Sequence, residues 1–262
     1  DGFNLKSTIL DFSTFDKRHT SHEISRILTT KLKELNILHK VIRVTCDGAS
    51  NMVRAVGDLN LESGRLWCVA HRLHLTVTNA SGFWIKKSGD ENICIDEAEN
   101  VTDSTDDHEE EMLDCDSLQP LDRMEINVKS RWNSTFCMID SFLVLREVIE
   151  RLLNSKHHLP LKSKAITKLA ELKLTSDDWA ILSQLHFVLQ PFFHATKVMS
   201  GRPYPSIGFA FDVLMRLKGV LQDHPPQKNS IVKRLKQLLL TKLLFYFESD
   251  NEQLYLLKVS GL

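Results

Sequence analysis

The sequence lacks the long apolar run that a membrane-spanning helix requires, since no stretch approaches about 20 apolar residues. Its first residues show no basic region followed by an apolar one, which argues against a secretory signal. Cysteine is scarce: the five residues are odd in number and widely spaced, so we expect no disulfide framework and a reducing intracellular compartment. We predict a soluble globular protein, because 262 residues with 42% hydrophobic content suffice to bury a core.

Basic residues are missing from one segment, although the whole chain is nearly neutral, with 33 basic and 34 acidic residues. Residues 90–116 contain thirteen acidic side chains and no Lys or Arg, which leaves 33 basic residues against 21 acidic ones elsewhere. A high charge of one sign with few apolar residues is typical of disorder, so we interpret residues 88–123 as a solvated acidic loop. The basic remainder is compatible with nucleic-acid binding, and also with ordinary solvated helices.

Deleting residues 90–116 is expected to strengthen non-specific DNA binding at low salt and to leave folding unchanged, because the acidic segment would screen the basic body. A DNA titration of the full and the deleted chain measures this effect. Equal DNA retention by the two chains would contradict the screening.

Short β-branched runs alternate with helical periodicity in the first part of the chain, which predicts an α/β arrangement with a mixed sheet covered by helices. Thr20 and Glu23 form a capping-box pattern ahead of the first helix. We expect the strands to be neighbours in one sheet. The predicted strands are residues 5–12, 41–46 and 66–70, and the predicted helices are residues 21–36, 50–56 and 72–79.

Apolar residues follow a helical period after residue 131, which predicts an all-α region with no long strand over residues 141–260. Thr175 and Asp178 mark the start of a long helix, and Pro191 is expected to bend or interrupt it. The predicted fold class is therefore α/β plus all-α. The other predicted helices are residues 132–153, 165–172, 206–221 (with Ser206 as N-cap) and 231–247.

Asp47 follows the predicted strand 41–46, in the run CDGASNM (46–52). A carboxylate at the carboxyl end of a buried strand faces the crevice where α/β proteins place their sites, and it suits a hard divalent cation. The alternative is that Asp47 is a turn residue or the N-cap of the next helix.

The run WCVAHRLH (67–74) places Cys68, His71 and His74 at three-residue spacing, which is compatible with zinc on a helical turn. A structural zinc site needs four ligands, and no fourth is nearby in the sequence. We therefore expect no zinc, and interpret these residues as a buried cysteine and hydrogen-bonded histidines.

The run KSRWNST (129–135) combines Arg131 and Trp132 with small hydroxyl residues at a predicted helix start. This combination suits phosphate contacts and base stacking. The alternative is a helix cap followed by a core tryptophan.

Taken in order, the runs CDGASNM, WCVAHRLHL and SRWNST resemble the catalytic region of the hAT-family DNA transposases, which have domesticated descendants among the zinc-finger BED domain-containing proteins. The runs ILDF, HTSHEI and PFFHATKVMSGRPYPS match as well, so the resemblance covers nearly the whole chain. It implies a partial ribonuclease-H-like fold interrupted by a helical insertion domain. The implied parts are a partial catalytic core (1–87), the acidic loop (88–123), a helix completing the core (124–150) and an incomplete helical insertion domain (151–262).

The resemblance assigns Asp47 to the second of the family's three catalytic acids, as a Mg²⁺ ligand in a two-metal clamp on the attacking and leaving oxygens. Gly48 stands where the family usually has an Asn. Cys68 and His71 match the family's C-x2-H motif near the active centre. Arg131 and Trp132, which follow Ser130, match its R-W motif, which is associated with handling the DNA end.

The other two acids of the family are not matched in this chain. We expect the first Asp to lie upstream of Asp1 and the third acid, a Glu, to lie downstream of Leu262. Glu248 and Glu252 do not match that Glu, and the family gives Asp11 no such role. One acid of three cannot assemble the clamp, so we expect no tight Mg²⁺ binding and neither cleavage nor joining of DNA by this chain as given.

Three functions follow from these observations. The first is a catalytically inactive, transposase-derived, nucleic-acid-associated fragment, with DNA as its partner and the nucleus as its location. The second is a portion of an active hAT transposase with a two-metal strand-transfer mechanism, and the third is a helical protein-interaction module. Self-association is expected through the family's carboxyl-terminal region, which is not matched here, and no membrane partner is expected.

Overall fold

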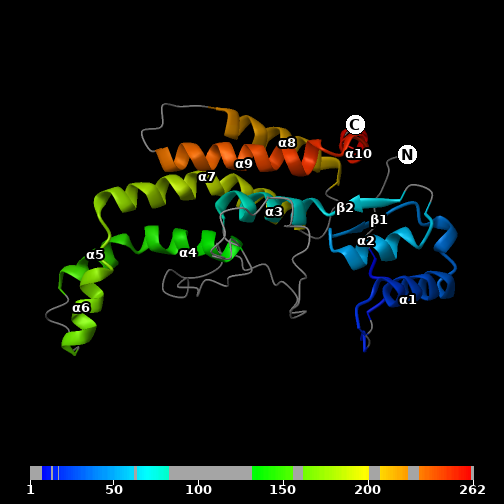
Figure 1. Ribbon diagram of the computed structural model, residues 1–262, viewed down its shortest axis with the longest axis horizontal. Coiled ribbons are helices and arrows are strands. Elements are labelled where there is room, and N and C mark those ends of the chain that lie inside the picture. The colour runs from blue at the N-terminus through cyan, green and yellow to red at the C-terminus, as the bar shows by residue number, and fades with distance from the viewer. Residues whose placement is uncertain are drawn as a thin grey trace, which may run out of the picture.

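The computed structural model describes residues 8–12, 14–16, 18–61, 64–82, 132–155, 162–200, 207–223 and 230–260. A small sheet with two covering helices lies at one end of an elongated molecule, and long helices make up the rest (Figure 1). In the sheet part the elements are α1 (Ser21–Glu34), the short 3₁₀ helix η1 (Leu38–Lys40), β1 (Val44–Cys46), α2 (Ser50–Gly57) and β2 (Arg65–Trp67). The helical part contains α3 (Val69–Ser81), α4 (Trp132–Val144), α5 (Arg146–Asn154), α6 (Ser163–Glu171), α7 (Ser176–Ser200), α8 (Ile207–Gln222), α9 (Ser230–Glu248) and α10 (Asn251–Ser260).

The sheet of the described residues consists of the two strands β1 and β2, which run parallel. Helix α2 connects them, as a parallel pair requires a crossover. The sequence predicted a mixed sheet, and the described residues show this parallel pair of it. Pairing of 41–46 with 66–70 is confirmed, but the strands are shorter than predicted because α3 already begins at Val69.

The predicted first strand, residues 5–12, is wrong over residues 8–12, which form no strand. Residues 5–7 lie outside the described residues. Ile9 and Phe12 are 75% and 89% exposed, so the alternating pattern does not mark burial here. A strand requires a neighbour for its backbone hydrogen bonds, and no described segment supplies one to residues 8–12.

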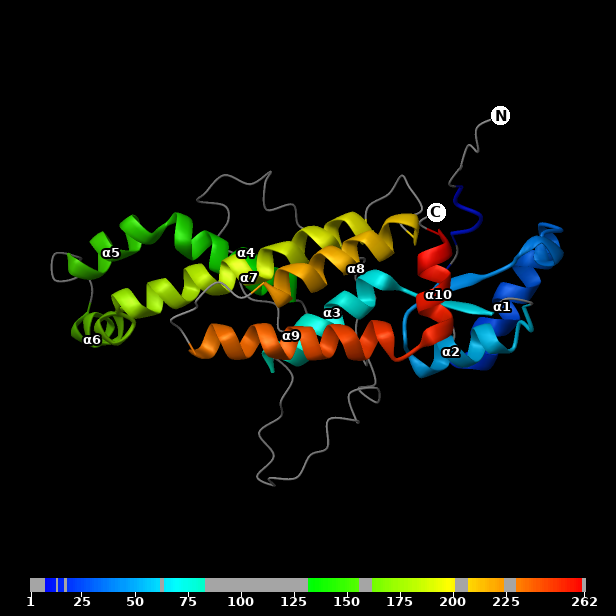
Figure 2. The same cartoon turned by 90° about the horizontal axis from the view of Figure 1, so that it is seen from above.

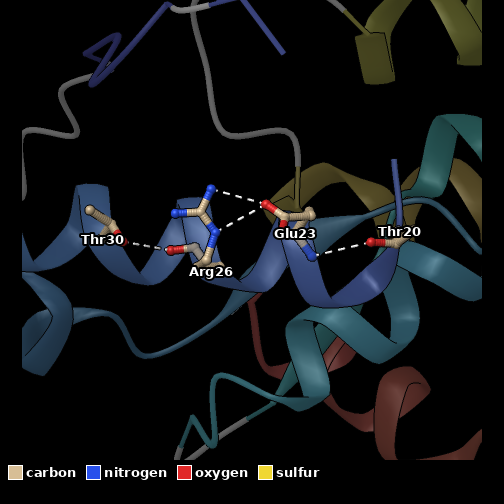
Figure 3. A network of polar contacts seen from close by, with 4 residues as sticks. All are labelled: Thr20, Glu23, Arg26 and Thr30. Carbon is tan, nitrogen blue, oxygen red and sulfur yellow. Dashed lines mark hydrogen bonds and ion pairs between the residues drawn. The ribbon is translucent and has the colours of Figure 1, made fainter. Parts of the chain in front are cut away.

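Helix α1 begins as the capping pattern predicts (Figure 3). The Glu23 amide donates to Thr20 Oγ1 at 3.4 Å. The Glu23 carboxylate accepts from Arg26 Nε at 3.0 Å, and the Thr30 hydroxyl donates to the Arg26 carbonyl at 2.8 Å. Local side-chain contacts therefore determine where this helix starts.

The main core lies between α3, α4, α7, α8 and α9, the long helices of Figure 2. Leu73 and Val77, one turn apart on α3, are fully buried. Helix α7 continues through Pro191, so the predicted interruption is absent. The buried Leu189 and Phe192 flank the proline, and their burial offsets the lost backbone hydrogen bond. No helix in the described part of the chain is both long and apolar enough to cross a membrane.

The remaining helices agree with the sequence except at two places. The predicted helix 132–153 divides at Leu145 into α4 and α5, and α10 was not predicted. The start of α7 is confirmed, since the Thr175 amide donates to Asp178 Oδ2 at 2.8 Å and the Asp178 amide donates to Thr175 Oγ1 at 3.2 Å. The Thr175 hydroxyl and amide lower the pKa of Asp178 by hydrogen bonding to its carboxylate. No strand occurs in the described residues between 132 and 260.

Cys137 in α4 is buried and disulfide-bonded, whereas the sequence predicted no disulfide framework. Cys46 and Cys68 are free. A disulfide requires Cα atoms within about 4.4–6.8 Å, and the spacing of cysteines along a sequence does not report that proximity.

Lys236 of α9 is buried and its ammonium group caps the end of α8. Its Nζ donates to the carbonyls of Val220 and Asp223, both at 3.2 Å. Replacing Lys236 with Met is expected to lower the free energy of unfolding by about 1–3 kcal/mol, because two carbonyls lose a charged donor at a helix C-terminus. Urea unfolding measures the loss, and Lys233→Met, on an exposed position of the same helix, should change it by less than about 0.5 kcal/mol.

Candidate functional site

Asp47 lies directly after β1, at the carboxyl end of the parallel strands, and is partly buried. Its Oδ1 accepts a hydrogen bond from the Ala49 amide at 3.2 Å, which closes a turn before α2. The N-cap of α2 is Ala49, so Asp47 is a turn residue but not the N-cap. No Lys, Arg or His of the described residues lies within 4.0 Å of the carboxylate.

Trp67 at the end of β2 carries two arginine contacts beside this turn. The guanidinium carbon of Arg65 lies 3.7 Å from the ring centroid of Trp67, and that of Arg72 lies 3.8 Å from it. Arg65 Nη1 also donates to the Asp47 carbonyl at 3.0 Å. The ring packs so closely on Gly48 that a Cβ there would lie 3.2 Å from Trp67 Cζ3. The backbone of the Asp47 turn therefore rests on Trp67 and Arg65.

The first turn of α10 binds the other edge of β2. Gln253 Oε1 accepts from the Trp67 amide at 3.2 Å, and Gln253 Nε2 donates to the Arg65 carbonyl at 2.7 Å. Asp250 Oδ2 accepts from the Trp67 indole N–H at 3.0 Å, while its Oδ1 accepts from the Gln253 amide at 3.1 Å. These contacts join residues that are more than 180 positions apart in the sequence.

Cys68, His71 and His74 lie at and after the start of α3. Cys68 is the N-cap of that helix, and the rings of His71 and His74 stack with centroids 6.1 Å apart. Within the described ranges, no three His, Cys, Asp or Glu side chains come together as a metal site would require.

Cys46 and Cys68 differ in burial although both are free thiols. Burial raises the pKa of the Cys46 thiol, and a hydrogen bond from Arg65 offsets part of the increase. Because the thiolate is the reactive form, iodoacetamide at pH 8 is expected to modify the partly exposed Cys68 several-fold faster than Cys46. The rate at Cys46 should still be rising above pH 9, as peptide mass spectrometry would measure. Equal rates at the two thiols would contradict the effect of burial.

Trp132 begins α4 and is 2% exposed. Its ring meets that of Phe193 edge to face, with centroids 6.5 Å apart, which corresponds to the core-tryptophan alternative. Arg131, the other residue of the predicted R-W motif, and the preceding Ser130 lie outside the described residues. The structure thus brings Asp47 and Cys68 to the sheet edge and places Trp132 in the helical core.

The residues that surround Asp47 were not predicted from the sequence. Trp67 and Arg72 stand in the run WCVAHRLH, where the cysteine and the histidines suggested the chemistry, and the others lie outside the predicted motifs. One signal was present: Asp250 and Gln253 stand at capping-box spacing, and the Asp250 carboxylate does cap α10 by accepting from the Gln253 amide. That spacing predicts a helix start but not a contact with the sheet. The missed residues are Arg65, Trp67, Arg72, Asp250 and Gln253.

No family model matches this chain. It is 24% identical over 263 residues to the protein described as "Putative AC transposase" from Zea mays, covering 96% of this chain and 32% of that protein. It is 22% identical over 280 residues to "Putative AC9 transposase" from the same organism, covering 96% of this chain and 33% of that protein. The chain therefore spans about a third of the length of the curated relatives it matches. The chain is thus similar to transposases of the hAT type over nearly its whole length, as the resemblance in its sequence motifs predicted.

Proposed function

We propose that this chain is a DNA-binding part of a transposase-derived nuclear protein, and that by itself it binds DNA without cutting it. The observation that carries the proposal is the placement of Asp47, a partly exposed carboxylate at the carboxyl end of parallel strands, in a chain related to transposases. Arg65 lies beside it, in a position to contribute positive charge for a phosphate backbone.

A Mg²⁺ ion prefers several oxygen ligands, and the described residues of this edge offer it the carboxylate of Asp47. Asp250, the acid that contacts the neighbouring Trp67, is engaged on both oxygens. The described residues therefore do not by themselves fit a magnesium site, and no metal-dependent step is derived from them. The proposal assigns Asp47 a role in metal binding only when acids from outside these residues complete the site.

The same proposal extends to the fold. The parallel pair β1–β2 with its crossover helix α2, followed by a long helical part, is compatible with a ribonuclease-H-like sheet carrying a helical insertion. Under this proposal β1 and β2 are two strands of a larger sheet. The division into core, acidic loop and insertion domain predicted from the sequence is part of the proposal.

The proposal is tested by fluorescence anisotropy with a labelled DNA duplex and by a nicking assay on plasmid DNA. We expect a Kd of about 10⁻⁴–10⁻⁶ M that weakens steeply between 50 and 200 mM salt. With Mg²⁺ or Mn²⁺ we expect no nicking or joining above the level of the Asp47→Ala variant. Nicking that Asp47→Ala abolishes would overturn the inactivity, and absence of binding at 50 mM salt would overturn the DNA-binding role.

A second candidate function, a protein-interaction module, is favoured by apolar side chains that α8 and α9 leave in solvent. Phe209 is 62% and Phe245 50% exposed. Helices α8, α9 and α10 also enclose a hollow of about 250 Å³ lined by residues such as Leu214 and Phe247. Exposed apolar surface of this kind is typical of contact sites for other proteins.

A further inference from the structure

The sheet part and the helical part of the molecule are linked at several places in the described residues. One link is covalent, where β2 leads through Cys68 into α3. A second is the Arg72 guanidinium group of α3, which lies over the Trp67 ring of β2. A third is the first turn of α10, which hydrogen-bonds to β2; α10 lies beside the small sheet (Figures 1 and 2). The orientation of the sheet part relative to the helices therefore depends in part on the contacts of α10.

Gln253 occupies the place of a neighbouring strand on β2. The Cys68 amide donates to the Cys46 carbonyl, which shows the edge of β2 that faces β1. In a strand the backbone groups of alternate residues point to opposite edges, so the Trp67 amide and the Arg65 carbonyl point away from β1. The Gln253 carboxamide accepts a hydrogen bond from the Trp67 amide and donates one to the Arg65 carbonyl. One side chain thus satisfies two backbone groups of the edge of β2 that faces away from β1.

The contacts continue from α10 to the Asp47 turn. Asp250 holds the indole N–H of Trp67, and the far side of the same indole packs on Gly48. Arg65, whose carbonyl Gln253 binds, donates from its side chain to the Asp47 carbonyl. The contacts of Asp250 through Trp67 thus reach the backbone of Gly48, and those of Gln253 through Arg65 reach the backbone of Asp47.

We propose that Asp250 and Gln253 are positioning residues, which hold the Asp47 turn in place and couple it to the α9–α10 end of the helical part. This positioning role rests on the proposed function in one respect, since it takes the Asp47 turn to be part of the functional site. A shift of α10 then displaces Trp67, and with it the backbone that carries Asp47. The helical part thereby controls whether Asp47 is presented in the geometry seen here.

The test measures amide hydrogen exchange of Trp67 and Ala49 by NMR in the full chain. In Gln253→Ala, the Trp67 amide loses its acceptor, and the Ala49 amide loses the ordered turn in which it donates to Asp47. We expect both to exchange about five- to tenfold faster. Asp250→Ala should act likewise, whereas Asp250→Asn keeps an acceptor for the indole and should restore slow exchange at Ala49.

Two controls separate positioning from a general loss of stability. Glu252→Ala changes an exposed residue of the same turn of α10, and should leave both amides unchanged. The amide of Val77, in the buried centre of α3, should keep its exchange rate in every variant if the fold is intact.

Faster exchange at Trp67 with an unchanged rate at Ala49 would overturn the proposal, because the contact would then be local to β2. Unchanged exchange at both amides in Gln253→Ala would overturn it as well. The DNA titration is read separately: a wild-type chain that does not bind DNA refutes the proposed function, while acceleration at Ala49 still supports the positioning role.

Discussion

Leu73→Ala is expected to lower the free energy of unfolding by about 3–5 kcal/mol. Leu73 is fully buried on α3, in the cluster that joins this helix to α7 and α9. Truncation removes its apolar contacts and leaves a cavity between three long helices, which cannot collapse freely around it. Urea unfolding followed by circular dichroism measures the loss as a lower midpoint at an unchanged slope.

The matched control is Leu172→Ala, the same chemical change at a side chain that is 65% exposed. It should alter the free energy of unfolding by less than about 0.5 kcal/mol. A loss at Leu73 no larger than the loss at Leu172 would show that α3 is not part of the cooperative core.

Arg72→Ala is expected to lower the free energy of unfolding by about 2–4 kcal/mol. Arg72 is 7% exposed, and its guanidinium group donates to the Tyr246 carbonyl of α9. The same group lies 3.8 Å from the ring centroid of Trp67 and 5.9 Å from that of Phe247. Alanine would leave a carbonyl without its donor and remove two cation–π contacts in a buried environment.

The comparison variant is Arg54→Ala, at an exposed arginine of α2. Thermal unfolding should show a marked decrease in Tm for Arg72→Ala and nearly none for Arg54→Ala. The Trp67 fluorescence of the folded protein should also change in Arg72→Ala, because the cation beside the indole is lost. A wild-type Tm in Arg72→Ala would mean that the guanidinium group makes no net contribution to stability.

The helices were predictable where short-range interactions determine them. The Thr20–Glu23 and Thr175–Asp178 capping patterns identified the starts of α1 and α7, and the structure contains the corresponding hydrogen bonds. The periodicity of α9 identified a helix within one residue of its observed ends. Such contacts span three or four residues, so they can be recognised in the sequence without knowing what the helix packs on.

The strands were less predictable, because a strand exists only where another strand or side chain satisfies its backbone. Residues 41–46 and 66–70 were predicted, together with 5–12, as neighbours in one sheet, and the observed ladder covers Val44–Cys46 and Arg65–Trp67. Residues 8–12 have an equally suitable composition, yet they form no strand of the described sheet. Composition therefore predicts the capacity to form a strand, and a neighbour decides whether it forms.

Asp47 and its place after β1 follow from the sequence alone, since a short β-branched run ends there in a turn. The surroundings of Asp47 were decided only by the tertiary structure. Asp250 meets Trp67 across 183 positions of the chain, and Gln253 meets it across 186. Hydrogen bonds of this kind depend on how α9 and α10 pack against α3 and α8, because only that packing brings the first turn of α10 to the edge of β2.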